Sequence, residues 1–183
     1  MKFKDYLDKQ TYDKYYQDIE LIKFEGYAKS CKSWDNIKDL VDWQDKTVID
    51  IGCFHGYFCF KAEKAGAKSV IGLDLNEDAL KTTMILAHEY KSNVNFLNIP
   101  ADGSFLSADI ILCLNVFHHI KNQDKFIDNI NAKYVIFEID KEDLPKIEKR
   151  FKILVKKDSH RASSYTGDTP NRLILLATIE NNT

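Results

Sequence analysis

Short apolar runs alternate with longer stretches of helical periodicity from residue 46 to the end of the chain. In the longer stretches apolar residues recur every three or four positions, as in amphipathic helices, whereas the short runs are rich in Val, Ile and Leu, as in strands. Because strands that alternate with helices form βαβ units, this pattern predicts an α/β fold with a mostly parallel sheet. The expected strands are residues 47–51, 69–75, 94–99, 108–114, 134–139, 151–155 and 172–179.

The helical stretches carry start and stop signals. Asn76 fits an N-cap, and Glu77 and Asp78 follow it in the first turn, where negative charge favours the helix dipole. Gly66 fits the residue that ends the preceding helix, because glycine readily adopts the left-handed conformation found there. The expected helices are residues 57–66, 77–90, 123–130 and 142–148.

The first 45 residues have a different character from the rest. Aromatic residues recur there among lysines and aspartates in the manner of amphipathic helices. These aromatic residues are Tyr6, Tyr12, Tyr15, Tyr16, Tyr27 and Trp34. We therefore predict a helical N-terminal extension over residues 1–45, which covers a domain formed by residues 46–183. The one long segment without periodicity is 159–171, between the last two expected strands.

Composition narrows the class of protein. The chain has 183 residues, 44% apolar and 30% charged, which excludes disordered and collagen-like classes and fits one compact soluble domain. No apolar run approaches the ~20 residues of a membrane span, and the first residues lack the apolar core of a secretory signal, so a cytoplasmic location is expected. A net charge of -2 gives no global attraction to nucleic acid. The four cysteines lack metal-ligand spacing, so no metal is expected: Cys31, Cys53, Cys59 and Cys113.

The segment VIDIGCFHGYFCF, residues 48–60, carries the strongest chemical signal. A strand ends near Asp50, and Gly52 and Gly56 follow before a helix begins. Glycine at such a turn lets the backbone approach a ligand closely and adopt positive φ. Asp74 lies at the end of the next strand, where a carboxylate can accept hydrogen bonds from both hydroxyls of a ribose. Together these features predict a nucleoside-binding site.

Two classes of nucleoside cofactor compete for this site. A nicotinamide dinucleotide fingerprint, G-x-G-x-x-G, would need glycines at 52, 54 and 57, where the chain has Gly52, Phe54 and Tyr57. An acid at position 50 would also repel a pyrophosphate, whereas it would attract an ammonium group. The residues therefore favour a cofactor that carries an ammonium group.

At this point the sequence resembles the class I S-adenosylmethionine-dependent methyltransferases, whose first motif is acid-x-Gly-x-Gly-x-Gly. Asp50, Gly52 and Gly56 match that motif, and Phe54 replaces its middle glycine. Asp74 matches the acid that the family places at the end of its second strand. The segment N-V-F-H-H, residues 115–119, resembles small-molecule and tRNA-modifying members, among them bacterial enzymes that modify the wobble uridine of tRNA.

This resemblance implies a Rossmann-like, doubly wound sheet of seven mostly parallel strands with helices on both faces and an antiparallel last strand. It implies S-adenosyl-L-methionine as cofactor, with 46–183 as the cofactor-binding domain. Asp50 would orient the methionine ammonium, Gly52, Phe54 and Gly56 would form the loop beneath the ligand, and Asp74 would hold the ribose. The remaining expected cofactor residues are Leu75, Asp102 and Leu114. Asp102 either reaches the adenine or starts a turn with Gly103.

The acceptor side would be lined by Asn115, His118 and His119, which follow the fourth expected strand. An imidazole titrates near neutral pH, so one histidine could accept a proton from the acceptor, and we choose His118 because it replaces a tyrosine of the tRNA-modifying relatives. The acceptor is a small molecule or tRNA, recognised by 1–45 and 159–171, by a partner protein or within a homo-oligomer. Two other functions stay open: a non-catalytic S-adenosylmethionine-binding module and a nicotinamide oxidoreductase.

Overall fold

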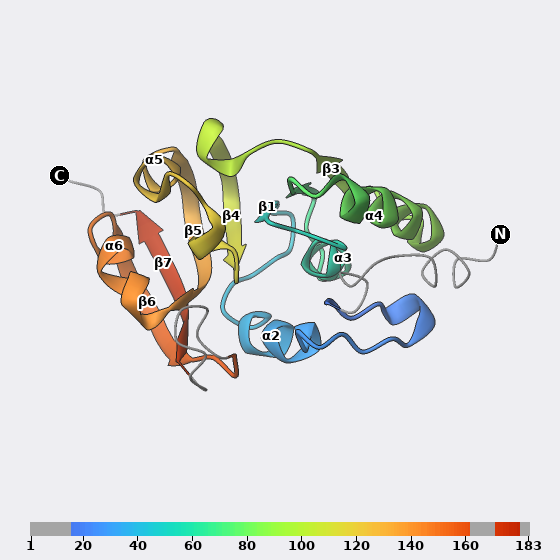
Figure 1. Cartoon of the computed structure of the whole chain (residues 1–183), viewed down its shortest axis with the longest axis horizontal. Coiled ribbons are helices and arrows are strands. Elements are labelled where there is room, and N and C mark those ends of the chain that lie inside the picture. The colour runs from blue at the N-terminus through green and yellow to red at the C-terminus, as the bar shows by residue number, and fades with distance from the viewer. Residues whose placement is uncertain (1–15, 162–170, 180–183) are drawn as a thin grey trace.

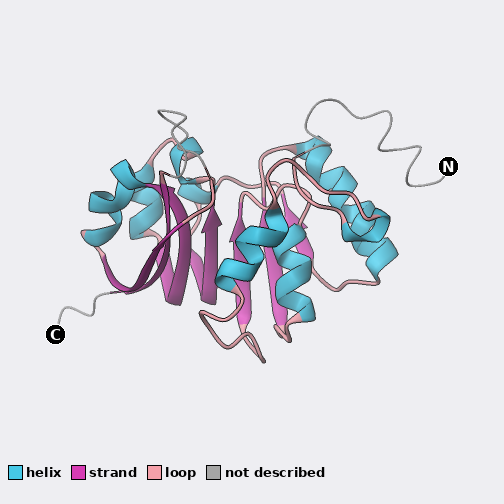
Figure 2. Ribbon diagram, turned by 90° about the horizontal axis from the view of Figure 1, so that it is seen from below, coloured by secondary structure: helices cyan, strands magenta, loops and turns pink. Residues whose placement is uncertain are grey.

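A computed structural model describes residues 16–161 and 171–179. They form one seven-stranded sheet in the order β3-β2-β1-β4-β5-β7-β6, with helices on both faces (Figures 1 and 2). The strands are β1 Thr47–Ile51, β2 Ser69–Leu73, β3 Asn95–Leu97, β4 Leu106–Leu114, β5 Ile130–Asp140, β6 Phe151–Asp158 and β7 Arg172–Ile179. The α-helices are α2 Ser30–Ile37, α3 Tyr57–Lys64, α4 Glu77–Tyr90, α5 Gln123–Asp128 and α6 Leu144–Glu148. Single 3-10 turns are η2 Glu20–Ile22, η3 Ala101–Gly103, η4 Phe117–His119 and η5 Lys141–Asp143.

The direction of the strands confirms the predicted fold class. β1 pairs in parallel with both β2 and β4, and β3 and β5 extend the parallel sheet on either side. β7 lies between β5 and β6 and is antiparallel to both. The strand order therefore reverses between β1 and β4, and open α/β sheets bind ligands at such a point, beyond the carboxyl ends of the strands.

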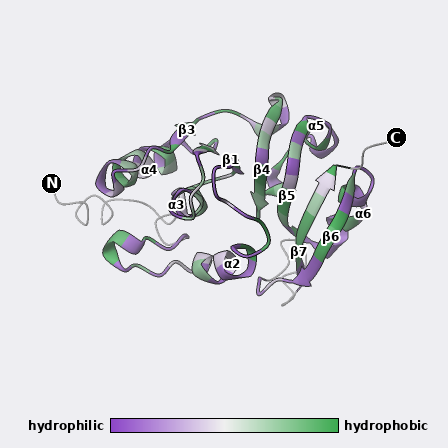
Figure 3. Ribbon diagram, turned by 180° about the vertical axis from the view of Figure 1, so that it is seen from behind, coloured by the Kyte–Doolittle hydropathy of each residue, from purple (hydrophilic) through white to green (hydrophobic). Residues whose placement is uncertain are grey.

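Two apolar layers hold the helices against the sheet. Helices α2, α3 and α4 contribute to one buried cluster, together with Val48 of β1 and Ile110 of β4. Helices α5 and α6 contribute to the other cluster, which includes Ile111 of β4 and Phe137 of β5. Neighbouring residues of β4 thus enter opposite layers, because successive side chains of a strand point to opposite faces. Hydrophobic residues dominate β4 and β7 (Figure 3).

Two helix boundaries predicted from the sequence are confirmed, and both depend on residues close together in the chain. The side chain of Asn76 accepts the N–H of Ala79 at 2.9 Å, which confirms the predicted N-cap of α4. Gly66 follows α3 with φ of +100°, as expected for the residue that ends a helix. β3 is shorter than the expected 94–99, because it lies at the sheet edge and only three of its residues pair with β2.

Pairing between strands shifts the predicted boundaries of other elements. β4 and β5 begin earlier than expected, because Leu106 pairs in register with Ile130 at the start of both strands. Helix α5 consequently ends at Asp128 rather than continuing to residue 130. The expected helix over 142–148 forms as the 3-10 turn η5 followed by α6.

The described part of the N-terminal segment contains η2, α2 and an isolated bridge between Ile19 and Phe24. Residues 1–15, 162–170 and 180–183 lie outside the described residues, so the helical prediction over 1–15 and most of the 159–171 segment are not covered. The division of the chain at residue 45 stays a prediction. None of the helices in the described ranges combines the length and apolar character that a bilayer crossing requires. Over the same ranges, no group of three or more His, Cys, Asp or Glu could hold a metal ion.

Candidate functional site

A cavity of about 590 Å³ lies beyond the carboxyl ends of β1, β2 and β4. The structure brings together most of the residues predicted from the sequence, since nine of the eleven line this cavity: Asp50, Gly52, Phe54, Asp74, Leu75, Asp102, Leu114, Asn115 and His119. Gly56 and His118 are not among the lining residues. The volume is within the usual range for cofactor sites, about 300–1,000 Å³.

The loop between β1 and α3 forms one wall of the cavity. Its residues Gly52, Phe54 and Gly56 all have positive φ, at +68°, +50° and +75°. The N–H groups of Gly52 and Cys53 both donate to the carbonyl of Leu73, which ties the loop to the end of β2. Phe54 takes the place of the motif's middle glycine. Its backbone has a left-handed conformation that residues other than glycine rarely adopt.

Gly52 is crowded by the protein itself. A Cβ at this position would lie 2.5 Å from Cγ2 of Val116. A larger residue would therefore collide with the segment after β4 and would also be strained by the positive φ. Gly56 is the N-cap of α3, and its added Cβ would lie 2.8 Å from Cγ2 of Thr83. Both glycines are explained by close contacts within the chain.

Asp74 joins the loop to α4. Its Oδ2 accepts the N–H of Phe54 at 2.7 Å, and its Oδ1 accepts the N–H of Asn76 at 2.8 Å. A carboxylate has about four lone-pair positions, so each oxygen can accept another hydrogen bond from a ligand in the cavity. The carboxylate is thereby held in a fixed orientation at the cavity wall.

Asp50 is almost completely buried, with 1% of its surface exposed, yet it lines the cavity. Burial, together with a smaller contribution from the nearby Asp74, raises the pKa of its carboxyl to about 7. The thiol of Cys59 donates to Oδ2 of Asp50 at 3.3 Å, which partly opposes this effect. A ligand cation would favour the ionised form of such a buried acid.

Other predicted cofactor residues lie along the same cavity. Leu75 follows β2 and is 65% exposed, so it offers an uncovered apolar surface to a ligand. Leu114 ends β4 and is buried. Asp102 lies in the turn η3 and also lines the cavity, while its Oδ2 accepts the N–H of Asn122 at 3.2 Å.

The two predicted histidines occupy different surroundings. His119 lines the cavity and is exposed. The side chain of His118 is only 12% exposed and lies with Nδ1 4.0 Å from Oδ2 of Asp140. Burial, together with the charges of His119 and Arg172, lowers the pKa of His118 to about 4. Of the two, only His119 borders the space in which a ligand would lie.

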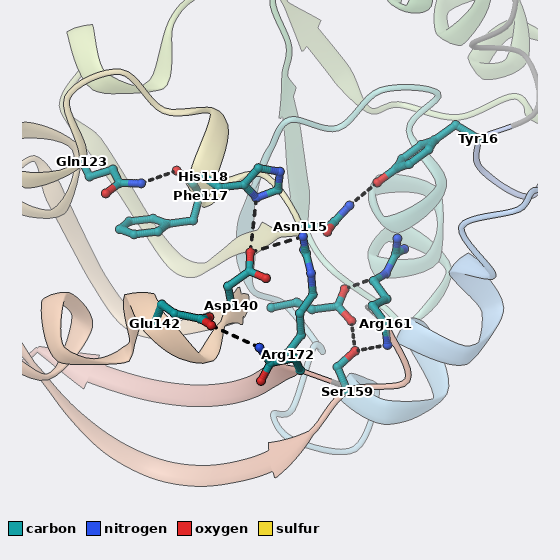
Figure 4. Close-up of polar contacts among 12 residues, drawn as sticks. Tyr16, Asn115, Phe117, His118, Gln123, Asp140, Glu142, Ser159, Arg161 and Arg172 are labelled. Atoms are coloured by element: carbon teal, nitrogen blue, oxygen red, sulfur yellow. Dashed lines mark hydrogen bonds and ion pairs between the residues drawn. The ribbon is translucent and has the colours of Figure 1, made fainter. Parts of the chain in front are cut away.

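Asn115, which the sequence predicts for the acceptor side, connects the segment after β4 to the N-terminal segment. It has φ of +60°, and its Nδ2 donates a short hydrogen bond to the hydroxyl of Tyr16 (Figure 4). The ring of Tyr16 packs edge-on against Phe54, with ring centroids 5.2 Å apart. Tyr16 therefore contacts both the loop after β1 and the segment after β4.

Sequence reasoning missed several lining residues. Gln17 is one of them, and its Oε1 accepts the N–H groups of His55 at 3.1 Å and Tyr57 at 3.4 Å, at the start of α3. Tyr27 and Arg161 also line the cavity. Tyr27 belongs to the aromatic pattern of the N-terminal segment and Arg161 to the segment 159–171, but no motif distinguishes either residue from its neighbours.

A buried polar network lies at the carboxyl end of β5 and includes Arg161, which lines the cavity. Glu138 and Asp140 lie at the carboxyl end of β5 and are both buried. Arg161 pairs with Glu138, Nε to Oε2 at 3.1 Å, and Arg172 pairs with Asp140, Nη2 to Oδ2 at 3.4 Å (Figure 4). Glu138 interrupts the apolar run of residues 134–139, and Asp140 follows that run directly. Two acids in an otherwise apolar strand are the sequence signal that could have revealed this network.

A doubly wound sheet with a cavity where its strand order reverses, and with carboxylates at the ends of its first two strands, defines a protein that binds a nucleoside-containing cofactor. Comparison with known families matches residues 49–134 to the family described as "Methyltransferase domain". This match and the relatives described below support a class I S-adenosylmethionine-dependent methyltransferase, whose cofactor is S-adenosyl-L-methionine. This confirms the family and the cofactor that the first motif indicates.

Individual relatives agree with this family. The tRNA U34 carboxymethyltransferase of Helicobacter acinonychis (strain Sheeba) is 32% identical over 126 residues, 64% of this chain and 46% of that protein. The ribosomal protein L11 methyltransferase of Colwellia psychrerythraea (strain 34H / ATCC BAA-681) is 39% identical over 85 residues, 45% of this chain and 27% of that protein. The chain thus spans less than half the length of these curated relatives.

A solved structure shows the same fold. The S-adenosylmethionine dependent methyltransferase from Mesorhizobium loti superposes with a TM-score of 0.64 at 16% sequence identity, covering 80% of this chain and 97% of that chain. At this identity the likeness concerns the arrangement of strands and helices. It agrees with the mixed seven-stranded sheet described above.

Proposed function

We propose that this chain transfers a methyl group from S-adenosylmethionine to a small molecule or to a nucleoside of tRNA. The observation that carries the proposal is that one cavity is lined both by acids suited to the cofactor and by polar residues suited to an acceptor. Asp50 and Asp74 border it at the ends of β1 and β2, and Asn115 and His119 border it after β4. Cofactor and acceptor can therefore lie side by side above adjacent strands.

The residues at the β1 and β2 ends fit the cofactor. Asp74 already has one backbone N–H on each oxygen and keeps lone pairs for the two ribose hydroxyls. Asp50 is buried without a neighbouring cation in the described residues, which suits the methionine ammonium. Leu75 offers an apolar face to the adenine, and Asp102 and Leu114 complete that end of the site.

When bound, the cofactor supplies a methyl group on a sulfonium, which is a good leaving group. The chain therefore mainly has to align the acceptor with that group and exclude water, and alignment alone can contribute ~7–11 kcal/mol. Tyr16, Gln17 and Tyr27 enclose the cavity from the N-terminal segment. His119 can accept the proton of a hydroxyl acceptor, whereas a thiolate or neutral amine needs no base.

The relatives bear on the identity of the acceptor. Relatives named tRNA U34 carboxymethyltransferase support a tRNA nucleoside, and a cytoplasmic location would follow from such a substrate. We keep the division into an N-terminal cover, 1–45, and a cofactor-binding domain, 46–183, as part of the proposal. A partner protein or a homo-oligomer could supply further acceptor contacts.

Calorimetric titration with S-adenosylmethionine, S-adenosylhomocysteine and NAD tests the cofactor. We expect the first two to bind and NAD not to bind, because Asp50 and Phe54 disfavour a dinucleotide. Binding of NAD alone would overturn the proposal in favour of an oxidoreductase.

The acceptor is then sought with methyl-labelled cofactor and two fractions of a cell extract, bulk tRNA and small molecules. Label in either fraction identifies the acceptor class, and mass spectrometry of the product distinguishes a methyl from a carboxymethyl adduct. Tight cofactor binding without label transfer in any fraction, alone or with added extract protein, would instead support a non-catalytic binding module.

A further inference from the structure

Arg161 places a guanidinium on the acceptor side of the cavity. Its side chain is only 11% exposed, and the residue lines the cavity together with Tyr16 and Asn115. The guanidinium carbon lies 5.9 Å from the centre of the Tyr16 ring. In Figure 4 the side chain extends from beside Ser159 toward Tyr16. A nearly buried cation at a ligand cavity requires partners on every donor that water does not reach.

Contacts with Glu138 and Ser159 fix the orientation of Arg161. Nε lies 3.1 Å from Oε2 of Glu138, which has 1% of its side chain exposed. Glu138 is itself held by Ser33, whose hydroxyl donates at 3.4 Å, and by a short hydrogen bond from the hydroxyl of Ser159. The backbone N–H of Arg161 donates to Ser159 Oγ at 3.1 Å. The guanidinium is therefore positioned rather than mobile.

The contacts of Arg161 leave part of its donor capacity unused. A guanidinium has five N–H groups in a planar fork. The Nε–H is directed at Glu138 and Ser33, whereas the two terminal nitrogens have no hydrogen-bond partner among residues 16–161 and 171–179. Arg172 differs, because it is buried beside Asp140 and does not line the cavity. The free fork matches the two oxygens of a carboxylate or a phosphate.

We propose that Arg161 determines acceptor specificity by binding a carboxylate or a phosphate of the acceptor molecule. This inference rests on the proposed methyl transfer, because it assigns the acceptor to the side of the cavity opposite Asp74. Glu138 is then a positioning residue that aims the guanidinium. The acceptor is an anion whose charged group lies close to the atom that receives the methyl group.

Binding of small probes to the protein loaded with S-adenosylhomocysteine tests this assignment. Benzoate and benzamide have nearly the same shape and differ in charge, and phenyl phosphate replaces the carboxylate by a phosphate. We expect benzoate or phenyl phosphate to bind about tenfold or more tightly than benzamide, as measured by calorimetry. The stronger of the two anions identifies the acceptor as a carboxylate or a phosphate. Equal affinity for all three probes would overturn the proposal.

Substitutions of Arg161 test whether this residue causes the preference for anionic probes. Arg161→Met should abolish the preference for anions, and Arg161→Lys should keep part of it, because the charge remains while the fork is lost. Lys121→Met is the matched control, since Lys121 is an exposed cation of the same cavity. If Arg161→Met is unstable because Glu138 is left unpaired, the double variant Arg161→Met/Glu138→Gln removes both charges. A preference lost in Lys121→Met but kept in the Arg161 variants would refute the assignment.

The same titrations separate this proposal from the methyltransferase proposal. If the protein binds no adenosyl cofactor, the proposed function fails, and the probes are then titrated into the ligand-free protein. If the cofactor binds and the anion preference is absent, only the role of Arg161 fails.

Discussion

The carboxylate of Asp74 at the end of β2 accepts the backbone N–H of Phe54, in the loop after β1, at 2.7 Å. Its other oxygen accepts the N–H of Asn76 at 2.8 Å, just before α4. One side chain therefore holds a left-handed residue of the loop and the start of a helix, and it also borders the cavity. Loss of this carboxylate should affect the loop and the ligand together.

Asp74→Ala should lower the affinity for S-adenosylmethionine on the order of a hundredfold. A charged acceptor that serves two hydroxyls contributes ~1.5–3 kcal/mol per hydrogen bond, and the loop also loses its anchor. Calorimetry gives the affinity, and circular dichroism checks the fold. Asp78→Ala is the control, because Asp78 is an exposed acid on α4 that does not line the cavity. A loss of less than about threefold for Asp74→Ala would contradict the ribose role.

Gly52→Val should destabilise the protein and abolish cofactor binding. A valine side chain in the loop beneath the ligand would block the cofactor, and its added Cβ would first collide with Val116, whose Cγ2 lies 2.5 Å away. The positive φ of Gly52 adds about 1–3 kcal/mol of strain. Thermal unfolding measures the loss. Gly103→Ala is the control, since its Cβ would meet only Pro100 Cγ at 3.3 Å. Val116→Ala added to Gly52→Ala should restore stability in part, and a complete restoration would disprove the backbone strain.

Cofactor affinity should depend on pH through Asp50. Because burial raises its pKa to about 7, this carboxyl is half-protonated near neutrality and pairs with an ammonium only when ionised. Affinity should therefore fall by up to about tenfold for each pH unit below that value. Without ligand, the raised pKa has the opposite consequence: stability is greatest below the unfolded pKa and decreases as the pH rises to about 7.

Calorimetry over a pH series measures the dependence on Asp50. Asp50→Asn is the control, because it removes the titrating group and leaves only the titration of the ligand amine. An unchanged pH profile in Asp50→Asn would show that Asp50 does not control binding.

The two histidines should give different phenotypes. His119→Gln should lower turnover on a hydroxyl acceptor by ~10²–10⁴-fold at nearly unchanged cofactor affinity, because His119 borders the cavity. His118→Gln should instead act on stability. The pKa of His118 is lowered to about 4, so the folded protein loses stability as the pH falls from the unfolded pKa toward that value. Thermal unfolding over this pH range should show a smaller acid loss in His118→Gln.

Turnover of the two variants shows whether His118, His119 or neither acts as the base. A large loss of turnover in His118→Gln, with wild-type turnover in His119→Gln, would restore His118 as the base expected from the sequence. Wild-type turnover in both variants would mean that alignment alone drives the reaction.

Local features made much of the molecule predictable. The apolar runs that became β1 and β7 and the cap at Asn76 depend on residues close together in sequence. The same holds for the cofactor loop, where Gly52 and Gly56 must adopt positive φ within one short turn. The sites of Asp50 and Asp74 follow because parallel strands end at one edge of a sheet.

Contacts between distant segments decided the rest. The sequence places His118 and His119 equally near β4, but packing of the neighbouring Phe117 into the core fixes which way the turn η4 faces. Arg161, which follows β6, meets Glu138 of β5, and Tyr16 reaches Asn115 from the N-terminal segment. Sequence by itself determined the existence and order of the strands along the chain, the loop after β1 and the acids at the ends of β1 and β2, because hydrophobic period and backbone sterics act locally. Only tertiary structure decided the surroundings of Asn115 and Arg161 on the proposed acceptor side, because the charges and hydrogen bonds there join segments that no local pattern relates.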